Sequence, residues 1–418
     1  MKLRIRVKKY DIEYEKYAFL AVAYALFFGA GTYGIKAIVT GIGLGSLQTL
    51  ASFFIYVGWF VLFFRLISGY FLVAVDVILV EVMVGVLFFI SYNAFPLTQV
   101  FYDEYAMFLR QVFVVYLPAG VILYHIKDFS GCFRYTRKIA LFGSVFLLIS
   151  YALGYVEVNG YQYWGVHLSP MLLLLFGSYL DKKAKSDLIM IIINCIMILF
   201  GGRQSLFVAI VGLCLMYFIM NKDKKQKRLL VMIILAFIIL IIILGSNMFL
   251  SVLSHFLDAF NIDSRTLEMV LNGELVDTSS RETIYESSLE AIRNSQGFSG
   301  VFADRYLLRA YGSWMAYPHN IFFEFILDFG KICGGVISIL MVVLVIANLT
   351  SGIKERKTFV ALLVSLVFIR LLVSSSFVIE GLFYTMLGLL FQLLAIKLKK
   401  AKRNDRYIYY DRQEAHFK

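Results

Sequence analysis

The sequence predicts an all-α integral membrane protein with about 12 transmembrane helices. Of its 418 residues, 60% are hydrophobic and only 16% are charged, whereas a soluble protein of this length carries about 25% charged residues. Apolar stretches close to the roughly 20 residues that a helix needs to cross a bilayer recur from one end of the chain to the other. Basic residues recur in every second connection between these stretches, which is typical of a multi-pass protein.

Twelve apolar segments define the predicted spans. They cover residues 17–35, 42–63, 71–90, 105–125, 139–157, 165–180, 187–200, 204–220, 229–248, 320–348, 358–377 and 380–397. The segments 165–180 and 187–200 are short, and merging them would invert the side on which every later connection lies. The later basic connections independently require the sidedness that twelve spans give.

Alternating the spans from a cytoplasmic N-terminus places the basic connections on one side. Lys and Arg cluster in residues 2–9, 126–138, 181–186, 221–228 and 351–357, and again after residue 396. The connections 93–104 and 157–164, on the opposite side, contain neither residue type. Because cytoplasmic connections are enriched in Lys and Arg, both chain termini are predicted to be cytoplasmic.

One long polar connection, residues 249–317, falls on the outer side. It divides the chain into an N-terminal bundle of about nine spans (1–248), the outer loop with short amphipathic helices (249–317), about three C-terminal spans (318–400) and a basic cytoplasmic tail (401–418). The loop carries Arg265, Arg281, Arg293, Arg305 and Arg309. Long loops translocate largely regardless of charge, so these arginines are compatible with an outer location and are candidates for function.

The formal charge of +12 lies mostly in the short basic connections, so nucleic acid is not an expected partner. The four cysteines form no CxxC pair, and the chain contains no HExxH and no Walker-type loop. We therefore expect neither a metal site nor a cofactor.

A short helix is predicted inside the outer loop. It starts at Ser279, which fits a capping box with Glu282, and ends near Asn294. Its apolar stripe consists of Ile284, Tyr285, Leu289 and Ile292. Arg281 falls in the first turn, where the helix dipole disfavours a cation unless an anion is bound there. Arg281 is therefore a candidate anion ligand; the alternative is a solvated arginine paired with Glu282 or Glu286.

Arg203 follows Gly201 and Gly202 at the predicted outer start of the span 204–220. An ionisable residue at this depth is costly and is by default a functional candidate. Paired glycines also allow the backbone to approach a ligand closely. The alternative is an arginine whose guanidinium reaches the lipid headgroups.

His319 lies in Tyr317-Pro318-His319-Asn320, at the predicted outer start of the tenth span. Histidine titrates near neutral pH and so is a suitable general base, although a lone histidine is more often structural. Glu324 and Asp328 extend a polar stripe from Asn320 into that span. They are candidates to orient a substrate sugar, to pair with an arginine or to line a crevice.

The ordered set of these motifs resembles the bacterial O-antigen polymerase and O-antigen ligase superfamily. The motifs are Gly-Gly-Arg-Gln-Ser at 201–205, Asp263-Ser264-Arg265, Ser279-Ser280-Arg281-Glu282-Thr283-Ile284-Tyr285, Gly297-Phe298-Ser299-Gly300, Asp304-Arg305-Tyr306, and Tyr317-Pro318-His319-Asn320 with Glu324 and Gly330. The resemblance covers about residues 200–335. Elsewhere only the many-span topology with one large outer loop is similar. The segment 297–300 has GxxG where relatives often have a tighter glycine pair.

The resemblance implies an all-helical membrane fold related to the C-type glycosyltransferases. It also implies transfer of a glycan from an undecaprenyl diphosphate carrier to an acceptor sugar at the outer face of the bacterial plasma (inner) membrane. Arg203 and Arg281 would match the arginines that engage the diphosphate, and His319 the histidine proposed near the acceptor. Arg265 and Arg305 are secondary phosphate candidates, and Tyr317, Asn320 and Glu324 are candidates to orient the acceptor.

The favoured function is a metal-independent polymerase of lipid-linked repeat units, for O-antigen lipopolysaccharide or for a capsular polysaccharide or exopolysaccharide. Membrane lipid, a chain-length regulator and a flippase are its expected partners. One alternative is an O-antigen ligase that transfers the glycan to lipid A core. The other is a flippase or transporter of lipid-linked oligosaccharide, which would instead depend on Asp76 and Glu81 in the third span.

Overall fold

The protein is described from a computed structural model. It describes residues 2–153, 161–199, 203–221, 279–295, 297–311 and 317–396. Within these ranges, the side chains of residues 2–12, 161–163, 203 and 279–282 are not described. The described chain is helical throughout, without a strand, which confirms the predicted all-α class. The predicted span 229–248 lies outside the described residues.

The helices follow the apolar segments of the sequence closely. They are α1 (Lys2–Gly41), α2 (Gln48–Ile67), α3 (Phe71–Ala94), α4 (Gln99–Glu104), α5 (Ala106–Gln111), α6 (Leu117–His125), α7 (Cys132–Leu153), α8 (Tyr161–Lys182), α9 (Lys185–Leu199), α10 (Arg203–Met220), α14 (Ser279–Asn294), α15 (Ala303–Ala310), α16 (Ile321–Phe329), α17 (Lys331–Thr350), α18 (Lys354–Leu363) and α19 (Arg370–Val373), with a last helix at Gly381–Ile396. Short 3-10 turns precede α2 (Gly45–Leu47) and α4 (Pro96–Thr98), and π-helical turns join α5 to α6 (Val112–Tyr116) and α18 to α19 (Val364–Ile369).

Six of the described helical segments are long and apolar enough to cross a membrane. They are Glu13–Gly41, Gly45–Ile67, Phe71–Ala94, Ala106–His125, Cys132–Leu153 and Lys331–Thr350. Two shorter apolar helices, Gln204–Met220 and Gly381–Ile396, match further predicted spans. The chain is therefore a multi-pass membrane protein, with six helices among the described residues that could each span the membrane.

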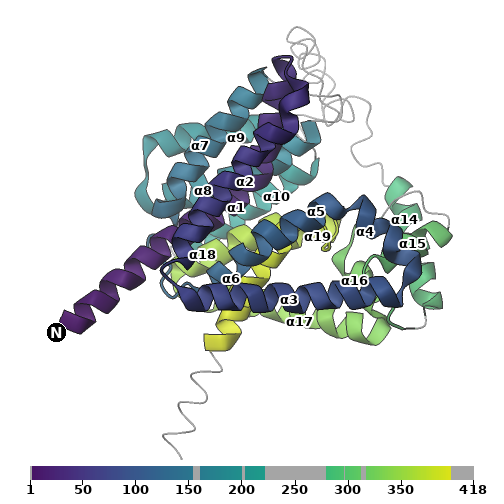
Figure 1. The fold of residues 1–418 in the computed structure, drawn as a ribbon. Coiled ribbons are helices and arrows are strands. Elements are labelled where there is room, and N and C mark those ends of the chain that lie inside the picture. Colours follow the sequence, from purple (N-terminus) through teal and green to yellow (C-terminus); the bar gives the residue numbers. More distant parts are fainter. Residues whose placement is uncertain are drawn as a thin grey trace, which may run out of the picture.

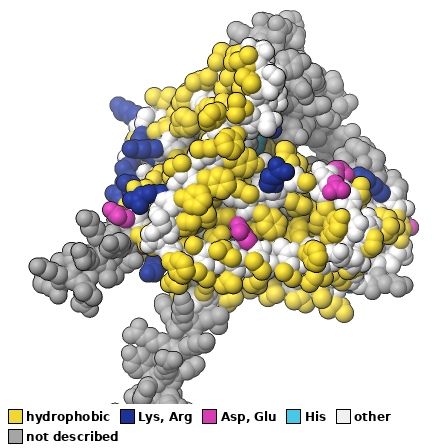
Figure 2. Space-filling model, viewed as in Figure 1, with side chains coloured by type: hydrophobic (Ala, Val, Ile, Leu, Met, Phe, Trp, Pro, Cys, Tyr) yellow, Lys and Arg dark blue, Asp and Glu magenta, His cyan; other side chains and the backbone are white. Residues whose placement is uncertain are grey.

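Two groups of helices make up the fold. α1 packs along α2 and α7, and α8 joins α7, α9 and α10. α3 packs on α6, while α14, α15 and α16 contact one another. In Figure 1, α14 and α15 lie together at the right-hand end of the molecule, opposite the labelled N-terminus. Figure 2 shows a largely hydrophobic visible face with Lys and Arg side chains gathered along its left edge.

The predicted single span 320–348 is wrong in one respect, because the chain breaks at Gly330 into α16 and α17. Gly330 has a φ of +80°, and a Cβ there would lie 2.6 Å from the carbonyl carbon of Gly297. Only glycine fits both the positive φ and this close approach. The break leaves α16 as a nine-residue helix at the end of the molecule that holds α14 and α15.

The helix α14 confirms the predicted loop helix, with the same first and last residues. Its buried face contains Ile284, Ser288 and Ala291, whereas Leu289 of the predicted apolar stripe is 44% exposed. The stripe is therefore rotated relative to the prediction, because small side chains rather than Leu289 face α15 and α16.

The last helix crosses α6 at very short range through two glycines. A Cβ on Gly388 would lie 1.9 Å from the carbonyl oxygen of Gly120, and a Cβ on Gly120 would lie 2.5 Å from the carbonyl oxygen of Tyr384. Small residues of this kind let membrane helices pack closely in the absence of a hydrophobic driving force between them. The crossing holds the last helix, and with it the Ser374–Glu380 connection, against the rest of the bundle.

We expect Gly388→Ala to destabilise the protein, because the added methyl group meets backbone that cannot move aside. The expected loss is about 1–3 kcal/mol, typical of overpacking, measured as a lower unfolding temperature in detergent. Gly335→Ala is the matched control, because a Cβ at Gly335 meets nothing within 4 Å. Equal unfolding temperatures for the two variants would contradict the close crossing.

Candidate functional site

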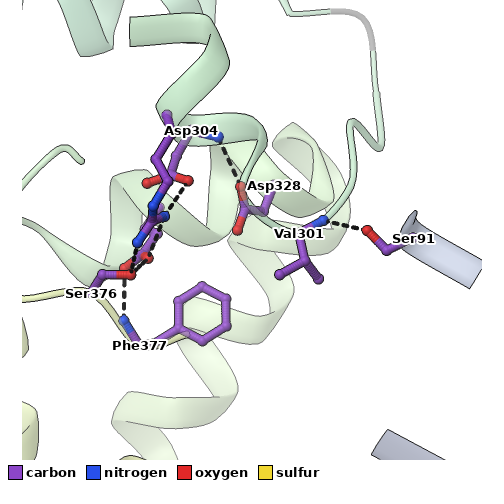
Figure 3. A network of polar contacts seen from close by, with 8 residues as sticks. Ser91, Val301, Asp304, Asp328, Ser376 and Phe377 are labelled. Atoms are coloured by element: carbon purple, nitrogen blue, oxygen red, sulfur yellow. Dashed lines mark hydrogen bonds and ion pairs between the residues drawn. The ribbon is translucent and has the colours of Figure 1, made fainter. Parts of the chain in front are cut away.

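A fully buried charge cluster lies where α15, α16 and the connection before the last helix meet. Arg305 on α15 is 0% exposed, and its Nη1 lies 2.7 Å from Asp304 Oδ1 and 3.7 Å from Glu324 Oε1. Its Nη2 donates a hydrogen bond to Ser376 Oγ at 2.8 Å. The Ser376 hydroxyl also donates to Glu324, and the backbone N–H of Phe377 donates to Glu324 Oε2 at 3.0 Å (Figure 3).

Asp328 completes the cluster one turn beyond Glu324. Its Oδ1 accepts a hydrogen bond from the backbone N–H of Asp304 at 2.9 Å, which fixes the start of α15 on α16 (Figure 3). Three buried carboxyl groups thus surround one guanidinium. Burial raises the pKa of Asp304 above its ordinary value, and the charge of Arg305 acts in the opposite direction. Removal of the one cation would leave these acids without a counter-charge.

Aromatic rings surround the other side of the guanidinium. The Arg305 Cζ lies 4.7 Å from the ring centroid of Phe302, 4.9 Å from that of Tyr105 and 5.8 Å from that of Tyr317. Cation–π contacts of this length are favourable when the cation is desolvated. The arrangement encloses Arg305 completely, so a substrate phosphate would reach it only if the cluster opened.

The GxxG segment at 297–300 docks the loop onto the end of α16. The backbone N–H groups of Ser299 and Gly300 both donate to the carbonyl oxygen of Asp328, at 3.0 and 3.1 Å. The N–H of Val301 donates to Ser91 Oγ of α3 at 2.8 Å (Figure 3). Because Gly300 has a φ of +94°, a side chain there would be strained and would also collide with Phe95. These contacts tie the loop to two separate helices.

His319 is connected to this cluster through Tyr317. The two rings lie 4.4 Å apart between centroids, and the Tyr317 ring faces the Arg305 guanidinium. His319 has a φ of +53°, a conformation that few residues other than glycine adopt and that is often found at functional sites. Asn320 then caps α16, its Oδ1 accepting from the N–H of Phe322 at 3.0 Å. The backbone around His319 is therefore held on both sides.

The other predicted arginines lie at helix starts or outside the described residues. Arg203 is the first residue of α10 and Arg281 is in the first turn of α14. α14 contacts α16, which places the Arg281 turn on a helix adjoining the His319 segment. Arg265 lies outside the described residues. The structure thus brings Tyr317, His319, Asn320, Glu324 and Arg305 together, and it links the helix of Arg281 to them.

The structure adds Arg370, a cation that the sequence analysis did not single out. Its Nη1 lies 2.7 Å from Glu380 Oε2, and its side chain is 22% exposed. It opens α19, which contacts both α10 and α16. Arg370 therefore lies between the helix that starts at Arg203 and the helix that follows His319. The signal in the sequence was an arginine inside a predicted span, which by itself is a functional candidate.

The site lies at the helix ends farthest from the basic connections. α10 begins beside Arg370 and ends at Met220, before Lys222 and its neighbours in the sequence. The α18–α19 segment begins at Lys354 and reaches the site at Arg370, and the last helix leaves it and ends before Lys397. In the sequence, each of these helical segments thus has a basic stretch at or next to the end that does not reach the site.

The carboxylates on which the transporter alternative depends lie elsewhere, on α3. Asp76 Oδ2 is 2.7 Å from His125 Nε2, and Glu81 is partly exposed beside Phe63 and Phe113. Among the residues that the structure describes, no group of three or more His, Cys, Asp or Glu side chains is placed to hold a metal ion.

Comparison with known protein families gives a match that overlaps the site. A family model described as O-antigen ligase matches residues 188–338, from α9 into α17. This match covers Arg203, Arg281, the buried cluster except Ser376, and His319, and it supports the O-antigen ligase and polymerase superfamily. No curated protein and no solved structure matches the chain.

We expect Arg305→Gln to destabilise the protein by about 3–5 kcal/mol, because it leaves buried carboxylates unpaired. The measurement is thermal unfolding in detergent, together with protease sensitivity of the α14–α15 region. Arg309→Gln is the control from the same helix, since Arg309 is about half exposed and its ion pair with Glu104 is 3.7 Å long; its expected effect is at most about 1 kcal/mol. An Arg305→Gln variant of normal stability that had lost activity would instead indicate direct substrate contact.

Proposed function

We propose that this protein polymerises lipid-linked oligosaccharide repeat units at the outer face of the bacterial plasma membrane. The observation that carries the proposal is the O-antigen ligase family match over the same residues that assemble the His319 site. The resemblance of the motifs at Arg203, Arg281 and Tyr317–Asn320 to this superfamily favours a reaction on an undecaprenyl diphosphate carrier. Capsule, exopolysaccharide and O-antigen repeat units are all substrates of the expected class.

Transfer breaks the bond between the anomeric carbon of the growing glycan and its diphosphate oxygen, and forms a bond to an acceptor hydroxyl. The departing diphosphate gains negative charge, which must be neutralised in the transition state. Arginines do this through bidentate contacts and remain protonated throughout. We assign this role to Arg203 and Arg281, with Arg265 as a further ligand, and we propose that no divalent cation is required.

His319 is the proposed general base. In this role its imidazole accepts the proton of the acceptor hydroxyl as the new glycosidic bond forms. The left-handed backbone at His319 and the Asn320 cap hold the ring in place before substrate binds. Direct displacement in one step would invert the configuration at the anomeric carbon. Asn320 and Tyr317, which flank His319, are proposed to orient the acceptor sugar.

Arg305 and Glu324 have a supporting role in this proposal. Both are buried and bound to each other and to Ser376, which suits residues that shape the site and does not suit direct ligands. Glu324 lies one turn beyond Asn320 on α16, so its fixed position also fixes the start of that helix. The cluster therefore stabilises the backbone from which His319 projects.

The proposal follows the positive-inside sidedness, with both termini in the cytoplasm. It places the diphosphate ligands and His319 at the outer face, where lipid-linked repeats arrive after a flippase has moved them. A chain-length regulator is the expected partner in the membrane. We favour polymerase over ligase from the Tyr-Pro-His-Asn context of His319; a ligase would instead transfer the finished polymer to lipid A core.

We expect Arg203→Ala, Arg281→Ala and His319→Ala each to lower polymer formation by about 100-fold or more, the effect of removing one charge-stabilising or proton-transferring group. The measurement is the ladder of surface glycan on a gel, with the amount of each variant in the membrane fraction. Arg293→Ala is the control, because Arg293 is exposed in the last turn of α14, on the same helix as Arg281.

The residual glycan distinguishes the two superfamily activities. Loss of a polymerase leaves a single repeat on the acceptor, whereas loss of a ligase leaves none. If all three variants still make full-length polymer, the catalytic assignment is wrong. If instead Asp76→Asn alone abolishes polymer, the transporter alternative gains support.

A further inference from the structure

A small cavity adjoins the start of α10, one residue beyond Arg203. It has a volume of about 20 Å³ and lies between α8, α10, the α18–α19 segment and the last helix. Its polar lining consists of Ser169, Gln204, Ser205 and Arg370. A cavity of this size holds about one water molecule or one oxygen atom of a ligand.

Two buried nitrogen donors of this lining have no hydrogen-bond partner among the described residues. They are Nε2 of Gln204 and Nε of Arg370. A buried donor left unpaired is costly, so such groups are nearly always paired with protein, water or a ligand. Both side chains line the same cavity, so the two unpaired donors belong to residues of one lining.

Only part of the Arg370 guanidinium is paired with Glu380. The ion pair uses Nη1, and Ser375 Oγ also donates to the same Glu380 Oε2, at 3.3 Å. Arg370 therefore lines the cavity and retains a donor, Nε, that Glu380 does not satisfy. α19, which begins with Arg370, contacts both α10, the helix that begins at Arg203, and α16, the helix that follows His319.

We propose that Gln204 and Arg370 bind a phosphate oxygen of the polyprenyl diphosphate substrate, as a further anchor beside Arg203. The inference rests on the function proposed above. The cavity admits one oxygen atom, and both of its unpaired groups are donors, so an anionic oxygen suits it better than a sugar hydroxyl, which must also donate. In the free protein a water molecule would occupy the same position.

The anchor also explains the pairing of Arg370 with Glu380. The carboxylate holds the guanidinium at the cavity before substrate binds and lowers the cost of ordering it. Arg370 then contributes charge to the departing diphosphate without becoming a buried cation that lacks a counter-charge. Arg370 and Gln204 are binding residues in this scheme, and the proton transfer remains with His319.

The test is binding of a synthetic polyprenyl diphosphate to the full-length protein in nanodiscs of zwitterionic lipid. Gln204→Met keeps the side-chain length and removes the donor. The double variant Arg370→Gln with Glu380→Gln removes both members of the ion pair, so that no buried charge is left alone. Each is expected to bind at least about tenfold more weakly than wild type, the loss of a charge-assisted hydrogen bond. Arg309→Gln is the control and is expected to bind as wild type does.

Three results would overturn the inference, and they differ in what they imply. If wild type binds the diphosphate and both variants bind it equally well, the cavity is no anchor and the proposed function stands. If wild type itself does not bind, the proposed function fails as well. If the variants lose as much affinity for phosphatidylglycerol as for the polyprenyl diphosphate, the cavity is a general lipid-phosphate site unrelated to the carrier.

Discussion

Arg305 is a fully buried cation, and the packing of α15, α16 and the connection before the last helix depends on it. A buried guanidinium must be paired and hydrogen-bonded, or it is very costly. Its partners come from three separate elements: Asp304 on α15, Glu324 on α16 and Ser376 before the last helix. These elements can satisfy the cation only when they are assembled in one arrangement. The cluster thus specifies how α15 packs against α16 and the connection before the last helix.

The same constraint defines where chemistry is possible. Tyr317 lies against Arg305 and His319 lies against Tyr317, so the candidate base is fixed by a chain of contacts that begins at the buried cation. The arginines proposed to hold the diphosphate are of a different kind, since Arg203 and Arg281 occupy the first turns of α10 and α14. In this arrangement the buried cluster would position the base, and separate arginines would bind the substrate. Catalysis and binding would then depend on different residues.

The sequence predicts well those features that depend on local pattern. The lengths of the apolar segments predicted the positions of the membrane helices. The capping residues and the stop residues of α14 predicted its two ends. The break at Gly330 was missed because a glycine within an apolar run does not by itself end a helix. The break depends on the close approach of Gly297, 33 residues earlier. The spacing of Asn320, Glu324 and Asp328 indicated a polar stripe on one helix face. It did not indicate that Arg305 would pair with Glu324 of that stripe.

Arg305 and Arg370 show the corresponding limit for the site. In the sequence, Arg305 has the same appearance as the other loop arginines, and its burial follows from partners as distant as Ser376. Arg370 lies within an apolar segment, and its relation to Gln204 arises only from helix packing. Charge type and order along the chain therefore identify candidate residues, whereas burial decides which of them are free to contact substrate.

The most direct measurement is conversion of purified lipid-linked repeat units by the purified protein alone, in the presence of a chelator of divalent cations. The account predicts a ladder of polymers on the lipid carrier without any added acceptor. Absence of polymer, with the glycan transferred only when lipid A core is supplied, would contradict the polymerase and indicate a ligase. Failure of both reactions with intact, folded protein would contradict the glycosyltransferase account as a whole.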